Sequence, residues 1–167
     1  HQQHWKENFN KIKAVLESAL KGLNTSIEHI GSTAVPDLAA KAIIDIDIVF
    51  DNFDEIKMRL EQIGYYHNGN QGIKDREVFK RKNSNEHPIL DSIIHHLYVC
   101  PSHSEALKRH LTFRAILIQN AAVREEYQII KYEIAAATNQ DKKQYVQLKE
   151  VRAKSFILSV ISRGQQE

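Results

Sequence analysis

The sequence has little of what marks secreted or membrane proteins. It contains one cysteine, Cys100, so no internal disulfide can form, and a reducing compartment such as the cytoplasm is expected. Its longest apolar stretch, Ala42 to Phe50, is interrupted by Asp45 and Asp47 and falls well short of a membrane span. These absences predict a cytoplasmic protein that does not cross a membrane.

An excess of charge of one sign is also absent. The 23 Lys and Arg residues nearly balance the 21 Asp and Glu residues, which leaves a net charge of +2. Composition therefore gives no strong signal for nucleic acid or a membrane surface as partner. With 42% hydrophobic and 26% charged residues, the chain is neither disordered nor fibrous. Its 167 residues, without internal repeats, suit a single domain over 1–167, whose oligomeric state the sequence leaves open.

Apolar periodicity predicts an α+β fold with an N-terminal helix, a mixed β-sheet and a C-terminal helical region. The first helix carries an apolar stripe from Trp5 to Leu23 with steps of three and four residues. The sheet part covers about 25–100 and the helical part about 102–165. We expect strands at Ile27–Ile30, Ile43–Phe50, Glu77–Lys82 and Ile93–Val99, and a polar loop at 83–88. A helix is expected after the N-cap candidates Asp51, Asn52 and Asp54, and it should stop at Gly64. Further helices should begin at Ser104, cover 121–137 and begin at Asp141.

Two acidic residues in the strand Ile43–Phe50 indicate a metal site. In a strand, Asp45 and Asp47 point to the same face, about 6.6 Å apart along the chain, while the intervening isoleucines point to the core. Two neighbouring carboxylates repel each other and are costly to desolvate, and a divalent cation such as Mg²⁺ or Mn²⁺ removes both problems. A half-exposed strand end with solvated acids explains the pair about equally well.

A Gly-Ser turn precedes this strand. Gly31 permits backbone conformations that other residues resist, and it lets a ligand approach the main chain closely. A helical turn after Ser32 would aim its free N–H groups at an anion such as phosphate. Alone, Gly-Ser is an ordinary turn in most proteins. Together with Asp45 and Asp47, the first of which follows Ser32 after twelve intervening residues, it indicates a combined phosphate and metal site.

The segment 28–48, EHIGSTAVPDLAAKAIIDIDI, resembles the leading motif of the GrpB-like family of the nucleotidyltransferase superfamily. Further similar motifs follow in order: GIKDREVF at 72–79, HHLYV at 95–99, LTFR at 111–114, Tyr127 to Lys131, and the helix with Tyr145, Lys149, Phe156 and Ile157. The resemblance extends from Trp5 to about Ile157. It implies a nucleotidyltransferase-like mixed sheet of about five strands with a C-terminal helical region.

The resemblance also implies a function, the metal-dependent transfer of a nucleotidyl group from a nucleoside triphosphate to an unknown acceptor. Asp45 and Asp47 would hold Mg²⁺ or Mn²⁺, and the metal ion would coordinate the triphosphate. Gly31 and Ser32 would bind the β- and γ-phosphates of the nucleotide. The remaining candidates for substrate binding are two cations near the turn, an aromatic residue and a helix cation: Lys41, Arg76, Tyr98 and Arg114.

One position departs from the polymerising members of the superfamily, which use a third carboxylate on a later strand. Here that strand carries His95 and His96, of which alternation allows only one to face the two aspartates. We favour His96 as a catalytic residue, because it shares its face with Tyr98. Two alternatives stay open: a nucleotide- or phosphate-binding module without turnover, and a metal-dependent hydrolase that uses Asp45, Asp47 and His96.

Overall fold

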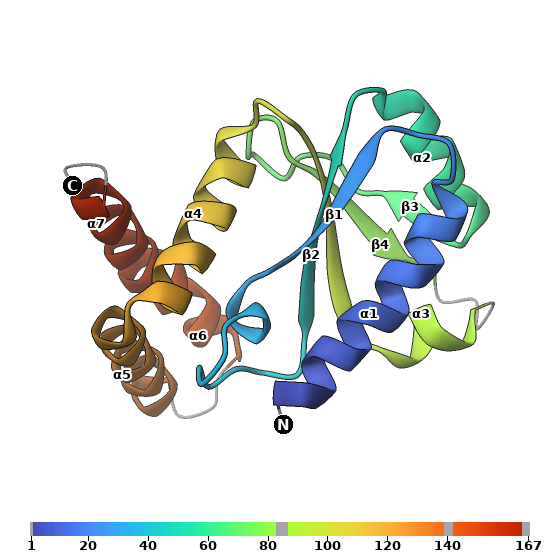
Figure 1. Cartoon of the computed structure of the whole chain (residues 1–167). Coiled ribbons are helices and arrows are strands. Elements are labelled where there is room, and N and C mark those ends of the chain that lie inside the picture. Colours follow the sequence, from blue (N-terminus) through green and yellow to red (C-terminus); the bar gives the residue numbers. More distant parts are fainter. Residues whose placement is uncertain (1, 83–86, 139–141, 165–167) are drawn as a thin grey trace. The chain divides into compact units, whose positions relative to one another are not determined.

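The computed structural model describes residues 2–82, 87–138 and 142–164 (Figure 1). Its chain forms two compact units, His1–His110 and Leu111–Glu167. The first unit contains α1 (Gln2–Ala19), β1 (Thr25–Ile30), a 3₁₀ turn (Ser32–Ala34), β2 (Ile44–Phe50), α2 (Phe53–Gln62), β3 (Tyr65–His67), β4 (Glu77–Arg81), α3 (Pro88–Ser92), β5 (His95–Pro101) and the first residues of α4 (Glu105–Gln119).

The five strands form one mixed sheet in the order β1-β2-β5-β4-β3. The two central strands, β2 and β5, run parallel, and every other neighbouring pair is antiparallel. Helix α2, β3, β4 and α3 lie between β2 and β5 in the sequence. The sheet therefore joins segments that are about fifty residues apart at its centre, and the α+β architecture with a mixed sheet is confirmed.

Alternation along β2 separates the core from the candidate site. Ile44, Ile46 and Ile48 are at most 1% exposed and belong to the main hydrophobic cluster, as the sequence predicts. Helices α1 and α2 lie together on this face of the sheet and supply a large part of the cluster, and the other strands and α3 supply the remainder (Figure 1). The helices and the turn directly after α1 contribute Trp5, Phe9, Ile12, Leu16, Leu20, Ile56 and Leu60. Asp45 and Asp47 consequently point to the opposite face.

The second unit is helical. After the rest of α4 it contains α5 (Ala121–Ala137), α6 (Lys142–Leu148), a π-helical turn (Lys149–Ala153) and α7 (Lys154–Gly164). Tyr127 packs edge-on against Phe113 and stacks on Phe156, with ring centroids 5.1 and 5.7 Å apart. Within the described residues of the chain, no helix is long and apolar enough to cross a membrane.

The sequence expectations differ from the structure at short elements. Strand β3 and helix α3 are not among the expected elements, and Pro88 begins α3 rather than ending a polar loop. The last strand begins at His95, two residues later than expected. Helix α5 covers the expected range, and α4 begins after Ser104, whose hydroxyl accepts from the Leu107 N–H at 3.2 Å. Residues 83–86 and the expected helix start at Asp141 lie outside the described residues.

Candidate functional site

The candidate site lies on the face of β2 opposite the core. Asp45 pairs with His96 across β2 and β5, and Asp47 pairs with Tyr98. Residues directly opposite in neighbouring strands point to the same face, so these four side chains belong together. His95 points to the other face, where its Nε2 lies 2.6 Å from the Tyr65 hydroxyl. The structure thus places His96 on the aspartate face, as expected from the face that it shares with Tyr98.

Asp45 is at the open side of the site. Its side chain is 27% exposed, and its Oδ1 accepts a hydrogen bond from Nδ1 of His96 at 2.8 Å. The His96 side chain is 54% exposed. A ligand that approaches from solvent therefore meets this pair first.

Asp47 is in the opposite situation, since it is fully buried. Its Oδ2 accepts a hydrogen bond from Nδ1 of His110 at 2.7 Å. Its Oδ1 is buried and has no hydrogen-bond partner among the described residues. A buried carboxylate oxygen without a partner is costly, and a bound cation would satisfy it. This oxygen is the observation that best fits a metal ion.

Sequence reasoning missed His110. It lies on α4, 63 positions from Asp47, and neither its spacing nor its neighbours mark it locally. It directly precedes the LTFR segment, which the sequence marks only by its resemblance to the family. The contact between His110 and Asp47 can be recognised only when the position of the start of α4 relative to the sheet is known.

The Gly31–Ser32 turn lies against Asp45. Gly31 has φ +72° and ψ −171°, and a Cβ at this position would overlap the Oδ2 atom of Asp45. The following 3₁₀ turn is held by Thr33, whose hydroxyl donates to the Ile43 carbonyl at 3.2 Å. The single hydroxyl proton of Thr33 is thereby donated, so Thr33 Oγ1 accepts a second hydrogen bond from Nε2 of His29 at 3.0 Å. The turn is thus in contact with Asp45, with which it is expected to share a site.

Arg76 and Tyr98 form the next part of the site. The Arg76 guanidinium lies over the Tyr98 ring, 4.7 Å from its centroid, and its buried Nε has no hydrogen-bond partner among the described residues. Burial, together with the negative charge of Asp45, raises the pKa of Tyr98 to about 12. Tyr98 is therefore a neutral phenol, and the ring face under Arg76 is covered by the guanidinium.

The two other expected cations are less closely defined. Lys41 is exposed in the segment between the 3₁₀ turn and β2. Arg114 lies in the part of α4 that belongs to the second unit. Their contribution to substrate binding stays a prediction. Glu28 is not among the expected residues, but it pairs with Asp47 across β1 and β2 and so shares the aspartate face.

The described residues contain no group of three His, Cys, Asp or Glu side chains that could hold a metal. Two carboxylates are nevertheless a sufficient protein contribution for Mg²⁺, which keeps several waters and takes substrate phosphates as further ligands. Asp45 and Asp47 therefore fit a metal ion that is shared with a phosphate-bearing ligand.

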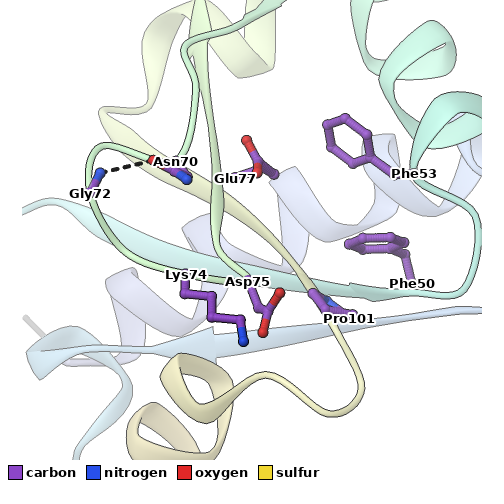
Figure 2. A pocket seen from close by; sticks show the side chains of 8 residues that line it. All are labelled: Phe50, Phe53, Asn70, Gly72, Lys74, Asp75, Glu77 and Pro101. Atoms are coloured by element: carbon purple, nitrogen blue, oxygen red, sulfur yellow. Dashed lines mark hydrogen bonds between the residues drawn. The ribbon is translucent and has the colours of Figure 1, made fainter.

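Two cavities flank the sheet. One, of about 590 Å³, borders the site, and its lining includes His96, Tyr98, Val78, Lys80 and Ile94. The other, of about 460 Å³, lies where β2 and β5 end, and shares no lining residue with the site (Figure 2). In the second cavity, Glu77 already contacts His67 and the Asn70 side chain accepts from the Gly72 N–H. We therefore associate the first cavity with the candidate site.

The comparison with known sequences identifies the family. A family model described as "GrpB protein" matches residues 1–162. The chain belongs to the GrpB family. Glutamate-rich protein GrpB of Alkalihalophilus pseudofirmus is 30% identical over 166 residues, which cover 97% of this chain and 91% of that protein. The protein YqkA of Bacillus subtilis is 31% identical over 151 residues, covering 89% of this chain but only 42% of YqkA.

Solved structures are similar to this GrpB-family chain as well. The crystal structure of the conserved protein GrpB from Enterococcus faecalis has a TM-score of 0.77 and 28% identity, with 96% of this chain and 94% of that chain covered. A structure of the Cid1 poly(U) polymerase bound to MgATP has a TM-score of 0.53 and 13% identity, covering 85% of this chain and 48% of Cid1. The second likeness shows a nucleotidyltransferase-like fold.

Proposed function

We propose that this GrpB-family protein is a metal-dependent nucleotidyltransferase that moves a nucleotidyl group from a nucleoside triphosphate to a hydroxyl-bearing acceptor. The observation that carries the proposal is the juxtaposition of the Gly31 turn with Asp45, beside a buried Asp47 whose Oδ1 has no partner among the described residues. This arrangement supports the binding of a phosphate group and a metal ion at one place. The fold shared with a poly(U) polymerase captured with MgATP supports the same chemistry.

Each side chain has a distinct part in this proposal. Asp45 and Asp47 would hold a Mg²⁺ ion, which neutralises charge on the triphosphate during transfer. The Gly31–Ser32 turn offers backbone N–H groups and a hydroxyl to the β- and γ-phosphates. Arg76 offers a guanidinium whose buried Nε lacks a partner among the described residues, a suitable donor for a phosphate oxygen.

The acceptor would approach through the 590 Å³ cavity that His96 and Tyr98 line. Its hydroxyl oxygen forms a bond to the α-phosphorus, the bond from that phosphorus to the bridging oxygen breaks, and pyrophosphate leaves. The hydroxyl proton passes to solvent or to a neighbouring base. His96 orients Asp45 through their hydrogen bond and contacts the arriving acceptor.

Calorimetric titration of the protein with Mn²⁺ and each nucleoside triphosphate tests the site. We expect binding that weakens at least about tenfold in Asp45→Asn and in Asp47→Asn, since each removes a charged metal ligand. Asp54→Asn, an exposed carboxylate in the first turn of α2, is the matched control and should bind like the original protein. Equal binding by all three variants would refute the site.

The products then distinguish the alternatives left open by the sequence. Release of pyrophosphate with a nucleotidylated acceptor supports transfer. Release of inorganic phosphate or of a hydrolysed ester supports the hydrolase, and tight binding without any product supports a nucleotide-binding module. Because the acceptor is unknown, the reaction is run with labelled nucleotide in a cell extract, and the label is followed into macromolecular and small-molecule fractions.

A further inference from the structure

His110 reaches the aspartate face through a short and well-fixed connection. Strand β5 ends at Pro101, whose carbonyl accepts from the Ser104 N–H at 2.9 Å. Ser104 is 1% exposed and caps the first turn of α4 through Leu107. The start of the helix is therefore tied to the end of the central strand, and His110 follows within two turns.

The hydrogen bond between His110 and Asp47 has a defined direction. A carboxylate oxygen only accepts, so the proton lies on Nδ1 of His110 and points to Oδ2 of Asp47 at 2.7 Å. The His110 side chain is 29% exposed, whereas Asp47 is fully buried. Asp47 therefore has one oxygen fixed by a protein donor and one, Oδ1, without a partner among the described residues.

We propose that His110 is a positioning residue that fixes the Asp47 carboxylate so that Oδ1 is presented to the metal. The inference rests on the proposed function. Without the Nδ1–H donor, the buried carboxylate is free to turn about its terminal torsion, because the energy profile of that torsion is broad. Partners that orient a ligating carboxylate typically change metal affinity by 10- to 100-fold. His96 cannot replace His110 here, because its hydrogen bond goes to Asp45.

The test compares two replacements of His110 by titration with Mn²⁺ alone, with the free ion followed by electron paramagnetic resonance. His110→Asn places an amide N–H close to the position of Nδ1, whereas His110→Gln places it near Nε2. We expect the His110→Asn variant to bind Mn²⁺ within about threefold of the original protein. The His110→Gln variant should bind it 10- to 100-fold more weakly. His103→Asn is the control, because His103 is 74% exposed and lies just before the same helix.

Thermal unfolding of each variant separates positioning from loss of the fold. Equal losses of Mn²⁺ affinity in His110→Asn and His110→Gln, or no loss in either variant, would overturn the positioning role while leaving the metal site intact. If Mn²⁺ binds only in the presence of a nucleoside triphosphate, the variants are compared under that condition. If the original protein binds Mn²⁺ neither alone nor with a nucleoside triphosphate, both the metal site of the proposed function and this inference fail. His110→Leu keeps the side-chain bulk without a hydrogen-bond donor and should lose Mn²⁺ affinity like His110→Gln. An unchanged Mn²⁺ affinity in His110→Leu would also overturn the inference.

Discussion

At the scale of single residues, Gly31 is restricted both by its backbone conformation and by its neighbour Asp45. Its φ of +72° is a conformation that residues with a Cβ rarely adopt, and the space a Cβ would need is taken by the Asp45 carboxylate. Two independent constraints therefore apply at one position. The first concerns the stability of the turn, and the second concerns the geometry of the carboxylate.

These constraints can be separated by experiment. Gly31→Ala should lower the free energy of unfolding by about 1–3 kcal/mol through backbone strain, and it should also displace Asp45 and weaken Mn²⁺ binding. Gly69→Ala is the matched control, since Gly69 has φ +70° but open space within 4 Å of where a Cβ would lie. Urea denaturation should show a loss in both variants, and calorimetry a loss of metal affinity only in Gly31→Ala. Unchanged affinity in that variant would contradict the close approach to Asp45.

At the scale of elements, β5 presents two neighbouring histidines to different environments. His96 points to the candidate site, while His95 lies against Tyr65 of β3 on the other face. The carbonyl of Ile93 only accepts, so Nδ1 of His95 carries a proton and Nε2 accepts from the Tyr65 hydroxyl. Burial lowers the pKa of His95, and the nearby positive charge of Arg81 lowers it further. His95 is therefore neutral in the folded protein.

This neutral histidine predicts a pH dependence of stability. The unfolded chain takes up a proton on His95 near its ordinary pKa of about 6.5, whereas the folded protein does so only at lower pH. Stability should consequently fall as pH drops through about 6.5 and level off below the folded-state pKa. Besides Arg81 and Tyr65, the charges of Asp91 and of a protonated His96 act on His95, although His96 points to the opposite face of the sheet.

Urea denaturation at pH 7.5 and 5.5 measures the effect. The variant His95→Asn keeps a donor for Ile93 but has no group that titrates in this range. It should lose less stability than the original protein when the pH is lowered. A larger loss in the variant would show that His95 is charged in the folded state.

The sequence predicted the elements whose signals are local. The isoleucine alternation indicated β2, and the range of α5 was expected residue for residue. Strand β3 has three residues and α3 has five, too few for a periodicity to appear. Alternation likewise indicated that only one of His95 and His96 faces the aspartates, and the face shared with Tyr98 favoured His96. The parallel pairing that sets His96 opposite Asp45 is seen only in the structure. His110 was missed because its contact depends on where a helix packs.

At the scale of the whole molecule, the two units differ in the size of their cores. The main hydrophobic cluster lies entirely within the first unit. The second has a small set of buried apolar side chains from four helical segments. They are Leu117, Tyr127, Ile134, Ala153, Phe156 and Val160. Fewer buried contacts lower the free energy needed for local opening, so the units should not open together.

Replacing Phe156 tests this separation. Phe156→Ala removes the ring that stacks on Tyr127 and leaves a cavity, which typically costs about 3–5 kcal/mol. Hydrogen exchange followed by mass spectrometry should become faster in α5 and α7, while β2 and β5 keep their protection. Mn²⁺ binding should be retained. Equal acceleration in the strands would instead indicate one cooperative molecule.

The parallel pairing of β2 with β5 also has a consequence for synthesis on the ribosome. Asp45 and His96 are 51 positions apart, which corresponds to about 3–10 s at translation rates of roughly 5–20 residues per second. During that interval β2 can pair with β1, but its other edge has no strand to pair with. An unpaired strand edge with an isoleucine-rich face is a template for association with other chains. The nascent protein is therefore most exposed to aggregation, and most in need of a chaperone, between the emergence of β2 and that of β5.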